Sequence, residues 1–176
     1  MINIKDYSMK QFSVLLSFIC LLALGQHAVA EESPAVAQAT PAANAIQLDV
    51  FKSPTCGCCA AWIEHVEERG FAATVNHPAD LAQVKKELGI APEFQSCHTG
   101  VSKEGYVFEG HIPANIVLKF LNSPPKDALG LAVPGMPMGS PGMEVGDRFS
   151  AYEVILLKKD GSSEVYAKVE TAKEQY

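Results

Sequence analysis

Three cysteines stand within four consecutive residues, Cys56-Gly57-Cys58-Cys59, a density that ordinary core packing does not require. Thiolate sulfur is the ligand that a soft metal ion such as Cu(I) prefers over oxygen. Neighbouring cysteines also allow one sulfur to bridge two metal ions, so a cluster of more than one copper fits this spacing. The motif therefore predicts a copper site, with the metal held as Cu(I).

Thiol redox chemistry competes with copper for the same residues. A Cys56–Cys59 disulfide is feasible, and so is a structural bridge from any of the three cysteines to Cys97. Adjacent Cys58 and Cys59 pair with each other only under strain. A C-x-x-C spacing between a strand and a helix is the arrangement of a thioredoxin-like oxidoreductase, because a helix N-terminus favours the thiolate. Val133-Pro134 also resembles the position of the cis-proline that faces the active disulfide in such folds. Against simple exchange stands Cys58, a third thiol that invites scrambled bridges.

Further soft ligands occur at three other places in the chain. Cys97-His98 supplies a fourth thiol and an imidazole, and His111 supplies a second imidazole. Met136, Met138 and Met143 fall within eight residues and are the only methionines after residue 30. The predicted metal-ligating set is Cys56, Cys58, Cys59, Cys97, His98, His111, Met136 and Met138.

Each of these ligands has an alternative role. Cys97 could be a small buried hydrophobe, the histidines hydrogen-bond partners, and the methionines packing for a loop rich in proline and glycine. Zinc also binds sets of four Cys and His, but structural zinc usually takes two spaced pairs of ligands. One compact triplet with thioethers nearby favours copper.

The first predicted elements place the cysteine cluster at a strand-to-helix turn. Alternating apolar residues over 46–51 predict a strand, and apolar residues recurring from 59 to 66 predict a helix that ends at Gly70. A second strand over 71–75 and a helix capped by Asp80 follow. This order predicts a β-α-β unit with parallel strands. On the first helix, Trp62 is expected in the core, while His65 and the later His77 are expected to face solvent.

The later elements complete an α/β pattern. Residues 94–101 and 106–109 are predicted to pair as a hairpin, and Pro113 suits the first turn of a helix that ends before Pro124. A long loop over 130–143 precedes a final hairpin of 152–158 and 164–169. We therefore predict a single thioredoxin-like α/β domain over residues 46–176, with a central mixed sheet flanked by helices.

The N-terminal segment predicts export. Two lysines, a short apolar run over 12–24 and an Ala28-Val29-Ala30 site indicate a signal peptide over residues 1–30, cleaved after about Ala30. The run is shorter than the ~20 residues that span a bilayer. Residues 31–45 are rich in alanine and proline and are predicted to be a flexible linker. The formal net charge of −6 gives no electrostatic basis for binding nucleic acid. After removal of the signal, no membrane partner is expected.

Four sequence blocks carry a resemblance to a known family. The blocks are Phe51-Lys-Ser-Pro-Thr-Cys-Gly-Cys-Cys59, Ser96-Cys-His-Thr99, Glu109-Gly-His-Ile-Pro113 and Gly130-Leu-Ala-Val-Pro-Gly-Met-Pro-Met-Gly-Ser-Pro-Gly-Met143. With them the chain resembles the CopG-type family from about residue 47 to residue 169. That family consists of exported bacterial copper-resistance proteins formerly described only as a domain of unknown function. The resemblance implies a thioredoxin-like fold and copper bound by the cysteines at 56, 58, 59 and 97, helped by nearby histidine or methionine. It also implies copper redox chemistry as the family's role.

These observations converge on one hypothesis. The chain is predicted to be a periplasmic protein that sequesters copper or converts it between Cu(I) and Cu(II) during copper resistance. Its expected partners are copper ions and another periplasmic copper-handling protein. Two alternatives stay open: a thiol–disulfide oxidoreductase that uses Cys56 and Cys59, and a copper chaperone.

Overall fold

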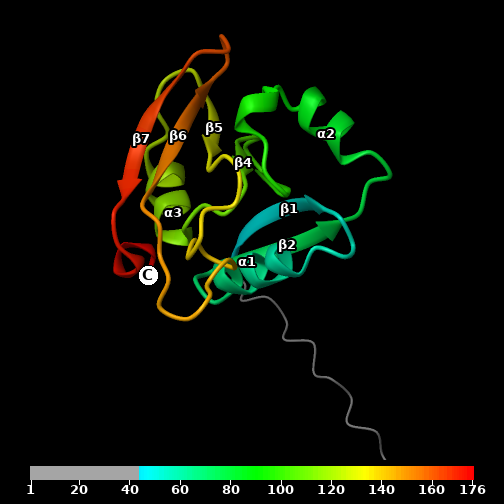
Figure 1. The fold of residues 1–176 in the computed structure, drawn as a ribbon. Helices are drawn as coiled ribbons and strands as arrows, with labels where there is room; N and C mark the ends of the chain where they lie inside the picture. Colours follow the sequence, from blue (N-terminus) through cyan, green and yellow to red (C-terminus); the bar gives the residue numbers. More distant parts are fainter. Residues whose placement is uncertain (1–43) are drawn as a thin grey trace, which may run out of the picture. The chain divides into compact units, whose positions relative to one another are not determined.

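The computed structural model describes residues 44–176 of the chain (Figure 1). The predicted signal peptide, and the predicted linker as far as residue 43, lie outside the described residues. The elements in chain order are β1 (Ile46–Lys52), α1 (Gly57–Glu67), β2 (Phe71–Asn76), α2 (Leu81–Glu87), η1 (Pro92–Phe94), β3 (His98–Ser102), β4 (Val107–Glu109), α3 (Ala114–Asn122), β5 (Ala128–Ala132), β6 (Tyr152–Lys158), β7 (Ser163–Val169) and η2 (Ala172–Gln175), where η denotes a 3₁₀ helix. Within residues 44–176, no helix is long and apolar enough to cross a membrane.

The seven strands form one mixed sheet in the order β2-β1-β3-β4-β5-β6-β7. β1 pairs with β2 and β4 pairs with β5 in parallel, and the other neighbours are antiparallel. The predicted α/β class with a central mixed sheet is confirmed, as is the parallel β-α-β unit at its start. The narrower assignment to a thioredoxin-like fold stays a prediction.

Helices cover the sheet on both faces. Because side chains alternate along a strand, neighbouring residues of the central strands enter separate apolar clusters. Phe108, Leu131 and Leu156 lie in the first cluster, and Val107, Ala132 and Leu157 lie in the second. The first cluster contains Trp62 of α1 and Phe120 of α3, and the second contains Ile90, which follows α2. Because Cys56, Cys58 and Cys59 lie at the start of α1, the cysteine cluster lies on the face of the sheet that α1 covers.

Three expectations about the middle of the chain were wrong. Residues 128–132, expected partly in a loop, form β5 in the interior of the sheet. Gly130 weakens the strand pattern in the sequence. A glycine is nevertheless needed at this position, because a Cβ at residue 130 would overlap the backbone of Val107 on β4. The strand expected from residue 94 begins only at His98, after the η1 turn. No peptide bond within residues 44–176 is cis, so Val133-Pro134 does not supply the expected cis-proline.

His65 is buried, contrary to the expectation that it faces solvent. The residue is 6% exposed, and the Ala114 N–H donates to its Nε2 at 3.1 Å. This bond satisfies a free amide at the N-terminus of α3, where Pro113 has no side chain able to cap the helix. The Tyr176 ring packs edge-on against the imidazole at 5.5 Å between ring centroids. Helical periodicity could not reveal this role, because α3 and the C-terminus reach His65 only in the folded chain.

The buried imidazole predicts a loss of stability in acid. Burial first, and then the positive charge of Arg69, lower the pKa of His65 from 6.5 to about 4. The unfolded chain therefore binds more protons than the folded chain between these values, so the free energy of unfolding falls as the pH falls from about 6.5 towards 4. We expect His65 to account for about 1–2 kcal/mol of the decrease between pH 7 and pH 5.

Urea unfolding of the wild type and of His65→Gln at both pH values measures this contribution. Glutamine keeps an acceptor for Ala114 but does not titrate, so the variant should lose less stability than the wild type on acidification. Equal losses in the two proteins would contradict the assignment.

Candidate metal centre

The cysteine cluster opens α1, as the sequence predicted. Cys56 is the N-cap residue of the helix, in an extended backbone conformation, and its sulfur accepts the Cys59 N–H at 3.3 Å. The first turn contains no acidic residue. The positive end of the helix dipole therefore lies at the cluster without a competing carboxylate, and a helix N-terminus in general stabilises negative charge.

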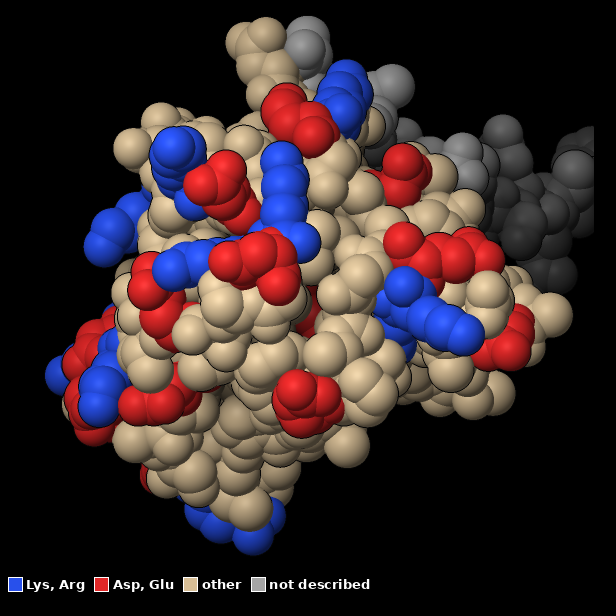
Figure 2. Space-filling view, turned by 90° about the horizontal axis from the view of Figure 1, so that it is seen from above, with Lys and Arg blue, Asp and Glu red and all other residues tan. Residues whose placement is uncertain are grey.

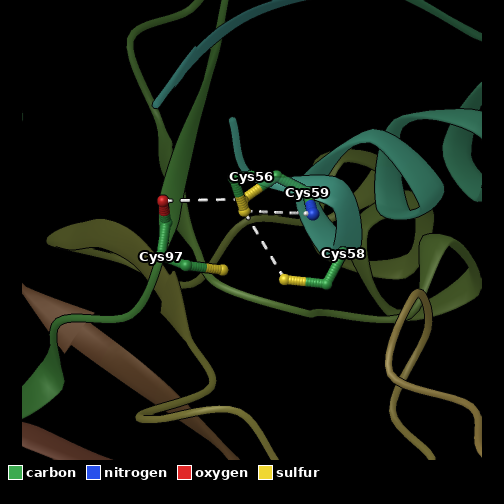
Figure 3. Close-up of side chains that lie close together, drawn as sticks. All are labelled: Cys56, Cys58, Cys59 and Cys97. Atoms are coloured by element: carbon green, nitrogen blue, oxygen red, sulfur yellow. Dashed lines mark hydrogen bonds between the residues drawn. A yellow bond between two sulfur atoms is a disulfide. The ribbon is translucent and has the colours of Figure 1, made fainter. Parts of the chain in front are cut away.

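Cys97 completes the group from a distant part of the chain. It directly precedes β3, which pairs antiparallel with β1 so that His98 lies opposite Lys52 at the end of β1. The sulfurs of Cys56, Cys58, Cys59 and Cys97 all lie within 4.8 Å of one another (Figure 3). Four soft donors at this spacing fit a soft metal ion, and the donor set matches what Cu(I) prefers.

Two of the four sulfurs are joined in this structure. Cys56 and Cys59 form a disulfide with Cα atoms 5.4 Å apart, while Cys58 and Cys97 are free thiols. The Cys58 sulfur lies 3.5 Å from the Cys56 sulfur. Cys59 Sγ also lies 3.7 Å from the Cys97 carbonyl oxygen, a packing contact because a disulfide sulfur has no hydrogen to donate. The structure therefore describes an oxidised form, and reduction would release two further thiols into the same space.

Two buried histidines extend the site beyond the sulfurs. The ligand atoms of Cys97, His98 and His111 lie within 4.8 Å of one another, and both imidazoles are fully buried. His111 Nε2 is 3.0 Å from the Cys97 sulfur, and its Nδ1 is 2.7 Å from the carbonyl oxygen of Pro141. A carbonyl only accepts, so Nδ1 carries the hydrogen and Nε2 presents its lone pair to Cys97. This is the tautomer that a metal-ligating histidine needs.

His98 lies beside the cluster. Its Nδ1 is 3.4 Å from the Cys97 sulfur, its ring packs against Trp62 at 4.3 Å between centroids, and its Nε2 has no hydrogen-bond partner.

Burial lowers the pKa of His98 well below its ordinary value, and burial also lowers the pKa of His111. Both imidazoles are therefore neutral near pH 7, which is the form that binds metals. Burial raises the pKa of the Cys97 thiol to about 11, so this residue is protonated in the metal-free protein.

The methionine loop lies against the site but exposes its thioethers. Met136 is 52% and Met138 is 38% exposed, and Met143 is half-buried. The loop backbone contacts the site where Pro141 meets His111 and where Gly142 packs on the first turn of α1. The ligand roles of Met136 and Met138, and those of the histidines and cysteines, stay predictions.

Sequence reasoning missed a polar network directly behind Cys97. Glu109 on β4 is fully buried, and it pairs with Lys85 of α2, which is also buried. A signal was present, because Glu109 is an acidic residue at the end of the apolar run Val107-Phe108. Nothing local linked this residue to a lysine on a separate helix.

The fold and the site together define an α/β protein with a four-cysteine group at a strand-to-helix turn. The family described as a protein of unknown function, DUF411, matches residues 94–143. A solved structure of copper resistance protein CopG, form 2, is 46% identical, covers 71% of this chain and 98% of its own, and superposes with a TM-score of 0.67. Form 1 of the same protein is 45% identical, covers 72% of this chain and 98% of its own, with the same TM-score of 0.67. No curated protein matches the chain.

The chain belongs to the CopG family of copper resistance proteins. This membership rests on the identity and coverage of both structural matches, and it confirms the resemblance carried by the four sequence blocks.

The methionine loop packs closely on α1 at Gly142, and this contact can be tested by mutation. Its φ is +85°, and an added Cβ would lie 2.5 Å from the Cys58 carbonyl oxygen and 2.8 Å from the Trp62 nitrogen. Gly142→Ala should therefore push the loop away from α1, lower the free energy of unfolding and speed alkylation of the Cys58 thiol.

Gly146→Ala is the matched control, since Gly146 also has a positive φ of +57° but no atom within 4 Å of an added Cβ. Backbone strain alone should lower the stability of the control by about 1 kcal/mol. Gly142→Ala should lose about 1–3 kcal/mol more, because its new methyl meets backbone that cannot move aside. Equal unfolding energies and equal alkylation rates would contradict the packing argument.

Proposed function

We propose that this protein binds copper as Cu(I) through Cys56, Cys58, Cys59 and Cys97, and sequesters it or converts it between Cu(I) and Cu(II) in copper resistance. The observation that supports this proposal most is the convergence of four sulfurs within 4.8 Å. Neutral imidazoles of His98 and His111 beside Cys97 add ligands suited to both oxidation states. Several sulfurs in so small a space favour a cluster of more than one copper ion.

The disulfide supports the redox form of the proposal. In the dithiol form, Cys56 and Cys59 can reduce two Cu(II) ions to two Cu(I) ions. The two electrons come from the thiol sulfurs, which then form the disulfide and release two protons. Reduction of the disulfide by an external dithiol would restore the starting form. The same four sulfurs would thus serve storage in one state and electron transfer between states.

We propose the cellular location and the partners of this protein from its sequence and its family. The signal-like segment over residues 1–30 and the copper-resistance relatives support an exported, periplasmic protein whose partners are copper ions and another copper-handling protein. The acidic net charge of −6 supports cationic rather than nucleic-acid partners.

A thiol–disulfide oxidoreductase is the second candidate function. The Cys56–Cys59 disulfide at the N-terminus of α1 favours it, because this is where a thiolate is most stabilised. The Cys58 thiol, 3.5 Å from the Cys56 sulfur, disfavours it, since it offers an internal route for attack on the disulfide.

Copper retention should depend on the redox state of the cluster. We expect the mature protein, reduced and loaded anaerobically with Cu(I), to keep at least one copper per chain after desalting against a competing chelator. The disulfide form should retain less, because two of its four sulfurs are no longer thiolates. Elemental analysis alongside a thiol count measures both. Failure of the fully reduced protein to retain copper would favour the oxidoreductase.

Cys58 separates the two candidate functions. Cys58→Ser should lower copper stoichiometry and weaken affinity by at least about tenfold, because it removes one thiolate of the cluster. It should leave reduction of a disulfide substrate intact, since exchange needs only Cys56 and Cys59.

Ala60→Ser is the matched control, because it adds a hydroxyl to the same helical turn at an exposed position and removes no sulfur. It should bind copper like the wild type. If Cys58→Ser binds as much copper as this control, and as tightly, the cluster proposal is wrong.

A further inference from the structure

One ion pair of this protein is buried, unlike the ion pairs on its surface. Four ion pairs occur within residues 44–176, and three of them are partly exposed, where solvent weakens them. Figure 2 shows such surface charges, with basic and acidic side chains interspersed on one face. The fourth pair joins Lys85 to Glu109, whose side chains are 4% and 0% exposed. A charge pair removed from water needs further hydrogen bonds to offset its desolvation.

The Glu109 carboxylate obtains these bonds from both sides of Cys97. Its Oε1 accepts the backbone N–H of Ser96 at 2.6 Å and is also paired with Lys85. Its Oε2 accepts the Thr99 hydroxyl at 2.5 Å, and Lys85 Nζ donates to the same hydroxyl oxygen at 3.1 Å. One carboxylate therefore contacts the residue before Cys97 and the residue two positions after it.

The sheet separates this network from the metal-ligating atoms. Thr99 on β3 lies opposite Glu109 on β4, on the face that contains Val107 and that α2 covers. His98 points to the other face, where it packs on Trp62. Glu109 therefore holds the backbone around Cys97 from behind, without contact between its carboxylate and any of the cysteine sulfurs or imidazoles described above.

We propose that Glu109 is a positioning residue that fixes Cys97 for copper binding, with Lys85 as its charge partner. This inference rests on the proposed copper function. Cys97 reaches the cluster from a non-helical segment that precedes β3. The backbone of this segment lies outside the hydrogen bonds between the strands, so it needs another anchor. The Glu109 carboxylate supplies an acceptor for the Ser96 amide, and its ion pair with Lys85 offsets the cost of burying it.

Two double variants separate positioning from bulk stability. Lys85→Met/Glu109→Gln removes both charges but keeps an oxygen that can accept the Ser96 amide. Lys85→Met/Glu109→Leu removes the charges and the acceptor together. Neither double variant leaves an unpaired buried charge, so both should fold. Leu156→Ala serves as a control destabilised by packing alone, because it opens a cavity on β6, which two strands separate from β3.

We expect the Leu double variant to bind Cu(I) at least about tenfold more weakly than the wild type in chelator competition. The Gln double variant should stay within about threefold, and Leu156→Ala should bind like the wild type. A Leu double variant that is folded and binds as tightly as the wild type would overturn the proposal. Equal weakening in the two double variants would also overturn it, because the acceptor would then not matter.

A copper-free measurement keeps the test independent of the proposed function. Iodoacetamide alkylates the Cys97 thiol of the oxidised protein, and peptide mass spectrometry measures the rate. This rate reports how firmly residues 96–99 are held. The Leu double variant should react about tenfold faster than the Gln double variant at Cys97, with Cys58 as the internal reference. Equal Cys97 rates would refute positioning. Failure of the reduced wild type to bind copper would instead refute the proposed function while leaving the alkylation result interpretable.

Discussion

Antiparallel pairing of β1 with β3 places His98 opposite Lys52, and this register carries Cys97 to the N-terminus of α1. A slip of one residue would turn His98 away from Trp62 and move the fourth sulfur out of reach of the other three. Buried residues on both faces of β3 hold the register, with His98 and Gly100 packed towards α1 and Thr99 bonded towards α2. The candidate ligand atoms are thus brought together by the sheet as much as by the cysteine motif.

The site combines soft donors with an interior that keeps imidazoles neutral. His111 owes its tautomer to the Pro141 carbonyl, so the loop after β5 contributes to the site through its backbone as well as through any thioether. The four sulfurs form one disulfide and two free thiols in this structure, and reduction would give four thiols. Under the proposed function, this redox state would decide how many thiolates a copper ion can meet at the cluster.

The local pattern of the chain was sufficient for most elements. Alternating apolar residues identified β1, and the hairpin pattern identified β6 and β7. The Asp80 cap of α2 is present, with its carboxylate accepting the Gln83 amide at 2.9 Å. β5 was missed because Gly130 weakens the strand pattern, although contact with Val107 is the reason that glycine is there. Burial of His65 was missed because its partners, Ala114 and Tyr176, are distant in sequence.

The sequence by itself determined three sulfurs of the cluster and their place at a strand-to-helix turn, because residues that are neighbours in the chain are close in any fold. Only the tertiary structure decided that Cys97, 38 residues after Cys59, joins them, because that contact depends on strand pairing. It also decided that the Glu109 carboxylate faces Lys85 behind the site. A buried charge is tolerated only where folding supplies its partner, and no local pattern records that partner.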